Sequence, residues 1–355
     1  MRDREEPGSR AADDPSGPAL PEARWWRSLD EQRILCQLCP HACRLEEGED
    51  GACRVRRRVG GKLRSLSYGR PTGFAVDPIE KKPLFHFLPG SPILSFGTLG
   101  CTLGCKFCQN WTYSHPDEVD LRGEFFPPEA VVKIAERQGT PAIAYTYNEP
   151  TVFAEYLVDI ARLAHERGIH NVAVTNGYIT PLARRNVFAD LDAANVDLKG
   201  FSDDFYREQA GGRLRPVLDT LEYIRQETKI WLEITTLLIP GLNDADEMLE
   251  AECAWIADRL GGDVPVHFTA FHPDFQMRDR PATPADRLHR ACAIARRHRL
   301  RFVYTGNIMD DEGLTTRCPT CHEVVIARGW NSGRATGLEG GLCKHCGSPI
   351  AGVFS

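Results

Sequence analysis

Three cysteines, Cys101, Cys105 and Cys108, have the spacing C-x3-C-x2-C and follow an apolar stretch, residues 93–99, that predicts a strand. Three thiolates on one short loop can bind three irons of a [4Fe–4S] cluster and leave the fourth iron without a protein ligand. An iron left open in this way can bind a further molecule and take part in chemistry. A zinc knuckle is the alternative, but such sites usually pair one C-x2-C with a distant second pair.

The open iron predicts a second cofactor. S-adenosylmethionine (SAM) can chelate this iron through its amino and carboxylate groups, and an electron from the cluster can then cleave the C5′–S bond. The products are methionine and a 5′-deoxyadenosyl radical, which abstracts hydrogen atoms. We therefore expect an enzyme in which these three cysteines are the catalytic metal ligands, while its substrate stays unidentified.

A second cysteine group lies near the C-terminus. Cys318 and Cys321 form one C-x2-C knuckle, and Cys343 and Cys346 form another. Two knuckles of this kind are typical of a zinc ribbon, whose four thiolates hold the metal in a tetrahedral site. An iron site of the same geometry is the alternative. We predict a structural zinc site here rather than a nucleic-acid interface.

A third cysteine group lies near the N-terminus. Cys36, Cys39, Cys43 and Cys53 have the spacing C-x2-C-x3-C-x9-C. They supply one full ligand set, so we expect a metal. The spacing does not match the usual bacterial ferredoxin run, and the residues leave zinc and an auxiliary [4Fe–4S] cluster both open.

The composition limits the classes of function. The chain has 355 residues, 42% of them hydrophobic, with a net charge of −6 and a pI near 6.0, so nothing global indicates binding to nucleic acid or an anionic membrane. No apolar run reaches the ~20 residues that span a bilayer, and the polar start lacks the core of a signal peptide. We therefore predict a cytoplasmic protein in which most of the 13 cysteines bind metal. Cys253 and Cys292 lie in helical patterns and are expected to pack in the core.

Strand-like and helix-like patterns alternate through the middle of the chain. The predicted strands are 93–99, 142–147, 171–176, 195–198, 230–239, 265–271 and 301–304, and the predicted helices are 128–138, 151–167, 216–226, 245–260 and 285–298. Such alternation predicts an α/β fold with a parallel sheet, here a partial (β/α)6-type TIM barrel whose site lies at the strand C-termini. The expected organisation is a disordered tail (1–29), a four-cysteine metal segment (30–80), the partial barrel (81–310) and a zinc-ribbon-like module (311–355).

Polar side chains follow successive predicted strands. Glu149, Asn176, the Asp197 and Lys199 pair and His272 each stand just past a strand end. Because the C-terminal ends of parallel strands meet at one edge, we expect these groups to converge on one cup. His272 is predicted to contact SAM or substrate there, and its alternative role is to cap a carbonyl at the barrel rim.

These motifs together resemble the radical SAM superfamily, in the group that includes the activating enzymes of glycyl radical enzymes such as pyruvate formate-lyase. The resemblance to the radical SAM enzyme of the AmmeMemoRadiSam system is closer still. The motifs that carry it are the cysteine triplet, Cys36-Gln-Leu-Cys39-Pro-His-Ala-Cys43, Asp77-Pro-Ile-Glu-Lys-Lys-Pro-Leu-Phe-His86, Tyr147-Asn-Glu-Pro150, Asp197-Leu-Lys199 and Phe271-His-Pro-Asp274.

The resemblance implies roles for individual residues. Phe107 would lie beside the SAM adenine and Glu149 near the SAM amino group. Positions that line the ribose and methionine ends would be Thr175, Asn176, Asp197 and Lys199. It also implies an electron donor such as flavodoxin or ferredoxin, and AMMECR-like and Memo-like partner proteins.

Two other functions compete with this prediction. An activating enzyme of a glycyl radical enzyme is one, although such enzymes often have Asp where this chain has Val174. An electron-transfer or metal-binding scaffold is the other. The scaffold has no need of a polar cup, so the residues at the strand ends favour an enzyme.

Overall fold

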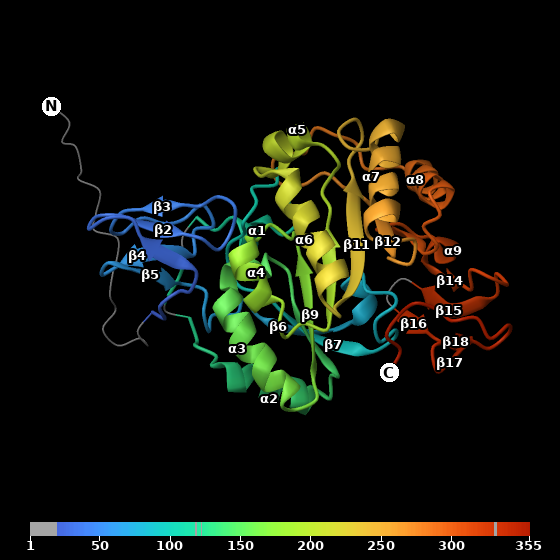
Figure 1. Ribbon diagram of the computed structural model, residues 1–355, viewed down its shortest axis with the longest axis horizontal. Coiled ribbons are helices and arrows are strands. Elements are labelled where there is room, and N and C mark those ends of the chain that lie inside the picture. Colours follow the sequence, from blue (N-terminus) through green and yellow to red (C-terminus); the bar gives the residue numbers. More distant parts are fainter. Residues whose placement is uncertain (1–19, 118, 122, 330–331) are drawn as a thin grey trace.

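The computed structural model describes residues 20–117, 119–121, 123–329 and 332–355 (Figure 1). A central sheet with its helices occupies the middle of the molecule, between the N-terminal strands on one side and the C-terminal strands on the other. Within the described part of the chain, no helix combines the length and apolarity that crossing a membrane requires.

An eight-stranded sheet forms the centre of the molecule. Its order is β13-β12-β11-β10-β9-β8-β7-β6, so the strands are neighbours in space as they are along the chain. Strands β7 to β13 pair in parallel, and β6 pairs antiparallel with β7. The strands are β6 (Phe74–Pro78), β7 (Pro92–Phe96), β8 (Ala142–Tyr145), β9 (His170–Thr175), β10 (Ala193–Asp197), β11 (Trp231–Leu238), β12 (Val266–Ala270) and β13 (Val303–Gly306). This mostly parallel sheet, with β13 and β6 at the two ends of its order, confirms the predicted α/β class.

Helices connect the parallel strands. The longer ones are α2 (Pro128–Gln138), α3 (Ala154–His165), α4 (Pro181–Val187), α6 (Leu214–Glu227), α7 (Asp246–Arg259) and α8 (Ala285–Arg297). Short turns are α1 (Trp111–Ser114), α5 (Asp203–Phe205), α9 (Asp311–Leu314), the 3-10 turns η1 (Ile79–Lys81) and η2 (Pro150–Phe153), and the π-helical turn η3 (Tyr206–Ala210). Helix α2 has the bounds that its sequence predicts. It starts at Pro128 and is terminated by Gly139, the residue after Gln138, whose φ of 63° suits glycine.

The seven predicted strands are all present, and the central sheet contains one strand, β6, that the sequence did not predict. This strand has Pro78 at its end and lies at the sheet edge, where a residue without an N–H is tolerated. Its burial does not alternate cleanly, because Val76 is exposed and Asp77 is buried. The alternation of buried and exposed residues that is typical of a strand is therefore absent from this segment.

The N-terminal part consists of two small sheets. One contains β1 (Trp26–Ser28), β2 (Ile34–Cys36) and β3 (Arg44–Leu45), and the other is the hairpin of β4 (Arg56–Val59) and β5 (Lys62–Ser65). Gly60 and Gly61 form the hairpin turn with φ of 60° and 73°. Two consecutive positive φ values are what a tight hairpin turn requires, and glycine supplies them without strain.

The predicted disordered tail, residues 1–29, needs a correction. Residues 1–19 lie outside the described residues, but Trp26–Ser28 forms strand β1, so the prediction is wrong there. The reason is tertiary contact. The Arg24 amide donates to Glu155 Oε1 at 2.6 Å, and the Gln37 amide donates to the Trp25 carbonyl at 2.7 Å.

The C-terminal part packs on the end of the central sheet. Its strands are β14 (Thr316–Arg317), β15 (Val324–Gly329), β16 (Ser332–Arg334), β17 (Leu338–Glu339) and β18 (Leu342–Cys343). A small core joins Cys318 and Cys343 to Phe85, Phe302 and Tyr304 of the central part. The module is thus fixed to the barrel through apolar contacts.

Candidate functional site

A cavity of about 450 Å³ opens at the C-terminal ends of the central strands. The three cysteines of the central triplet line it. Five other predicted site residues line it as well: Phe107, Glu149, Asn176, Asp197 and Lys199. The structure therefore brings together side chains that the sequence places at the ends of separate strands.

The loop that carries the triplet is held by its backbone. The amide of Gly104 donates to the carbonyl of Ala210, in η3, at 2.8 Å. The amide of Leu103 donates to Cys101 Sγ at 3.4 Å. Amide-to-sulfur contacts of this kind stabilise a thiolate, so the loop is prepared for metal binding.

Two thiols of the triplet, those of Cys101 and Cys105, favour the protonated form when no cation is bound. Burial raises the pKa of Cys105 to about 12 and raises that of Cys101 well above its usual range, with repulsion from Glu149 adding to the effect at Cys101. A bound cation reverses this balance, because a coordinating thiol is deprotonated outright. Desolvated thiols gathered on one loop therefore fit the irons of a cluster.

Glu149 is a buried carboxylate at the cavity wall. Its Oε1 accepts hydrogen bonds from the Thr151 amide (2.9 Å), the Thr151 hydroxyl (2.6 Å) and the Thr175 hydroxyl (2.7 Å), and its Oε2 accepts from the Asn176 amide (2.7 Å). Burial raises its pKa, although these four bonds oppose the shift. The network fixes the orientation of this carboxylate in the cavity wall.

Thr175 and Asn176 have different positions in this network. Thr175 is buried and acts on Glu149 rather than lining the cavity. The side-chain amide of Asn176 donates to Thr102 Oγ1 at 3.0 Å and lies 3.6 Å from Cys101 Sγ. It thereby links the cup to the cysteine loop.

Asp197 and Lys199 form an ion pair of 2.8 Å at the end of β10. Burial disfavours the charged ammonium, but the attraction of Asp197 and Cys105 outweighs it and raises the pKa of Lys199. The side chain is 19% exposed. An ammonium held in place by Asp197 therefore lines the cavity together with the triplet.

Comparison with known proteins agrees with this geometry. Residues 96–252 match the sequence profile described as the Radical SAM superfamily, and this stretch includes the cysteine loop and the ends of β7 to β11. The chain is also 40% identical over 335 residues to an uncharacterized protein of Methanocaldococcus jannaschii, a match that covers 93% of this chain and 98% of the other. This chain belongs to the radical SAM superfamily. Membership implies a [4Fe–4S] cluster and SAM.

Two further similarities are more partial. A pyruvate formate-lyase-activating enzyme of Clostridium pasteurianum is 28% identical over 157 residues, which is 42% of this chain and 62% of that enzyme. The crystal structure of a radical SAM methyltransferase from Sphaerobacter thermophilus has a TM-score of 0.50 at 16% identity, covering 90% of this chain and 82% of the other. This second similarity concerns the fold alone.

One group of cavity residues was not assigned a role from the sequence. Lys82 Nζ donates to Asp77 Oδ2 at 2.7 Å, the Tyr147 hydroxyl donates to the same oxygen at 2.8 Å, and Lys82 lies 4.7 Å from the centre of the Tyr147 ring. All three line the cavity. Tyr147 has a φ of 69°, a strained conformation for a non-glycine residue that is common at functional sites. The motif at residues 77–86 could have pointed to Asp77 and Lys82. Their contact with Tyr147, however, forms only when the chain folds.

His272 lies apart from the cavity. It is exposed just past β12 and is absent from the residues that line the cavity. Phe107, in contrast, is 2% exposed and contacts the Phe205 ring, with ring centres 5.9 Å apart. The structure thus does not bring His272 to the cup, whereas it places Phe107 in the cavity wall.

The two outer cysteine groups differ in geometry. In the C-terminal quartet, Cys318 Sγ lies 3.6 Å from Cys346 Sγ and Cys321 Sγ lies 3.7 Å from Cys343 Sγ. Among the residues that the structure describes, it is the one group whose ligand atoms all lie within 4.8 Å of one another. This quartet can bind a metal ion. The N-terminal cysteines, one of which ends β2, form no such close group in the part of the chain that the structure describes.

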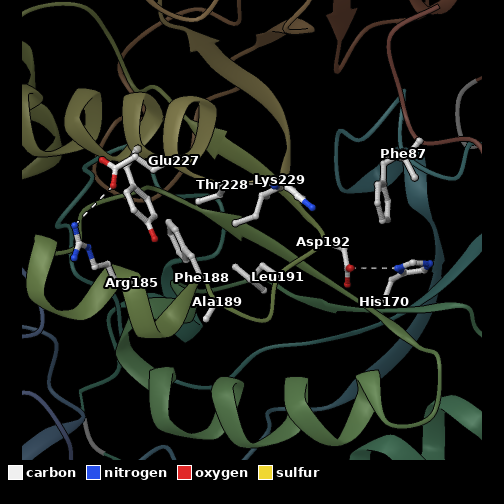
Figure 2. A pocket seen from close by; sticks show the side chains of 13 residues that line it. Phe87, His170, Arg185, Phe188, Ala189, Leu191, Asp192, Glu227, Thr228 and Lys229 are labelled. Atoms are coloured by element: carbon white, nitrogen blue, oxygen red, sulfur yellow. Dashed lines mark hydrogen bonds and ion pairs between the residues drawn. The ribbon is translucent and has the colours of Figure 1, made fainter.

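A second hollow, of about 530 Å³, lies at the opposite ends of the strands (Figure 2). His170 Nδ1 lies 3.4 Å from Asp192 Oδ1 there, and Arg185 pairs with Glu227 at 3.8 Å. No residue of the predicted site lines this hollow. Sites of parallel α/β sheets lie at the C-terminal strand ends, so we place the active site in the other cavity.

Proposed function

We propose that this chain is an enzyme that binds a [4Fe–4S] cluster through Cys101, Cys105 and Cys108 and cleaves SAM reductively. The observation that carries the proposal is the shared cavity, in which three thiols face Glu149 and the Asp197–Lys199 pair. When bound, the cluster and SAM supply methionine and a 5′-deoxyadenosyl radical that abstracts hydrogen from a substrate.

The cavity residues act by binding and orientation. The carboxylate of Glu149 holds the ammonium of SAM, and the ammonium of Lys199 holds an anionic group near the cluster, with Asp197 fixing its position at 2.8 Å. Phe107 offers an apolar face to the adenine. Charge-assisted contacts of this kind are strong because the groups are already desolvated and oriented.

Electron paramagnetic resonance tests the proposal. The anaerobically reconstituted and reduced protein should show a cluster signal that changes on addition of SAM. Cys105→Ala should lose the SAM-dependent change, whereas Cys253→Ala, at a buried thiol outside the cavity, should keep it. A signal insensitive to SAM in the unmodified protein would contradict the assignment.

Activation of a glycyl radical enzyme is a second candidate. Relatives named as activating enzymes support it, among them the pyruvate formate-lyase-activating enzyme of Clostridium pasteurianum. Val174 in place of the Asp common in that group argues against it. A hydrogen-abstraction assay with a purified glycyl radical enzyme would show a glycyl radical signal if this candidate is right.

The finer resemblance to the AmmeMemoRadiSam system is also a proposal. It is supported by the motif 77–86, whose Asp77 and Lys82 line the cavity. We propose AMMECR-like and Memo-like proteins as partners and a flavodoxin or ferredoxin as the electron donor. Titration calorimetry with the purified proteins tests each pairing.

We also propose zinc in the C-terminal quartet. A single zinc ion with sulfurs at about 2.3 Å in a tetrahedron separates those sulfurs by about 3.8 Å. The measured separations of 3.6 and 3.7 Å are close to this value.

A further inference from the structure

The three cysteine groups of this chain fall into two geometric classes. Sulfurs that share a single metal ion must lie close together, whereas in a four-iron cube each thiolate binds a different iron and the sulfurs stand further apart. The C-terminal quartet has the close arrangement, with all four ligand atoms within 4.8 Å of one another. The central triplet, which belongs to the radical SAM motif, is more widely spaced.

The N-terminal quartet has the wide arrangement. In the described part of the chain, which includes all four of its cysteines, no three of its sulfurs lie within 4.8 Å of one another. Cys36, Cys43 and Cys53 nevertheless lie close together. The sulfurs of Cys43 and Cys53 both lie within 3.8 Å of the point where a Cβ on Gly51 would stand, and the Cys36 amide donates to the Cys43 carbonyl at 2.9 Å.

The surroundings of these thiols suit a buried cluster. Cys36, Cys39 and Cys53 are each less than 10% exposed and belong to the same apolar core as Cys105 of the catalytic loop. The Ala52 amide donates to Cys43 Sγ at 3.4 Å. This contact has the same distance as the one between Leu103 and Cys101 on the catalytic loop.

The N-terminal segment also contacts the catalytic loop directly. A Cβ on Gly100 would stand 2.5 Å from the Cys53 carbonyl, so only glycine allows this approach. His41, between two of the N-terminal cysteines, has its Nε2 at 2.7 Å from the Thr102 carbonyl. The segment that carries the N-terminal cysteines therefore contacts the loop that carries the central triplet.

We propose that Cys36, Cys39, Cys43 and Cys53 bind a second [4Fe–4S] cluster, with a thiolate on every iron, beside the catalytic one. A cluster without an open iron can exchange electrons but cannot chelate SAM. The metal assignment stands without the proposed function, whereas a role in supplying electrons for SAM cleavage rests on it.

Iron, sulfide and zinc analysis of the full chain tests the assignment. The triple variant Cys101→Ala, Cys105→Ala, Cys108→Ala leaves the N-terminal ligands intact. After anaerobic reconstitution it should retain about four irons and four sulfides per chain, against about eight of each in the unmodified protein. It should keep a brown colour and a reduced-cluster resonance signal while forming no 5′-deoxyadenosine.

A second variant removes ligands of the N-terminal quartet and leaves the central triplet intact. Cys39→Ser with Cys53→Ser should lower the iron content from about eight to about four per chain while the SAM-sensitive signal persists. In the reduced unmodified protein, the two cluster signals should broaden each other because the sites are adjacent. A triple variant with no iron and about two zinc ions per chain would overturn the proposal. That result would leave SAM cleavage by the unmodified protein untouched, so the two failures are distinguishable.

Discussion

At the scale of the residue, Glu149 is held in one place by its hydrogen bonds. Four hydrogen bonds from Thr151, Thr175 and Asn176 hold its two oxygens, in a position where burial alone would favour the neutral acid. A network so fully satisfied keeps a single orientation. We infer that the surrounding residues serve to hold a carboxylate ready for a cationic partner.

Replacing this carboxylate should weaken SAM binding without loss of the cluster. Charge-assisted hydrogen bonds contribute about 1.5–3 kcal/mol, so Glu149→Gln should raise the Kd of SAM by about 10-fold to 100-fold. Equilibrium dialysis against SAM, with iron analysis of the same sample, measures both quantities. Glu252→Gln is the matched control, because Glu252 is equally buried but lies outside the cavity. Equal affinities of the two variants would contradict the role of Glu149.

The sequence predicted some of the cavity residues and missed others, for a physical reason. The cysteine triplet lies on one loop, so its chemistry is local and visible in the spacing. The contact of Asp77 and Lys82 with Tyr147 joins an edge strand to the end of β8, and no local pattern encodes it. For His272, the place after a strand was predicted, but the direction of the chain beyond Ala270 was not.

At the scale of the element, the pattern predicted the buried strands of the central sheet and helix α2. The seven parallel strands were predicted because buried strands are near-continuous apolar runs. Strand β6 was missed because its edge position relaxes that requirement. Helix α7 departs from the usual pattern in another way, because it buries an acidic side chain. Glu252 accepts a hydrogen bond from the Thr236 hydroxyl of β11 at 2.5 Å.

The burial of Glu252 should make the stability of the protein depend on pH. Burial raises its pKa to about 7 in the folded chain, while the unfolded chain keeps the ordinary value of 4.5. The folded state then binds the extra proton, so this group's contribution to stability falls as pH rises from 4.5 through 7. Glu252→Gln removes this cost, and its gain in unfolding free energy should be larger at pH 8 than at pH 6 by about 1 kcal/mol. Anaerobic urea denaturation at both pH values measures it, and an equal effect at both would refute the assignment.

At the scale of the whole molecule, the cysteine-bearing parts lie on either side of the central sheet (Figure 1). The N-terminal part contacts the catalytic loop through Cys53 and His41. The C-terminal part instead packs on Phe85 and Tyr304, away from the cavity. The N-terminal cysteine group therefore adjoins the loop that carries the central triplet, whereas the C-terminal group does not.

Removing one cysteine of the C-terminal quartet should show whether that site holds zinc or iron. Cys346→Ser, at the exposed member of the C-terminal quartet, should lower the zinc content by about one ion per chain and leave the iron content unchanged. Its melting temperature should fall, because a structural zinc site contributes to folding. Mass spectrometric metal analysis measures both metals, with Cys292→Ser as the control at a buried thiol. Loss of iron together with zinc would argue for a cluster in this quartet instead.

SAM cleavage at the central triplet should yield a 5′-deoxyadenosyl radical. Chromatography of 5′-deoxyadenosine, after anaerobic incubation of the reduced full chain with SAM, tests it most directly. We predict that the unmodified protein and Cys253→Ala form this product, and that replacement of Cys101, Cys105 or Cys108 by Ala lowers it to the level without enzyme. Undiminished product in any of those three variants, or none from an unmodified protein that carries its clusters, would contradict the account.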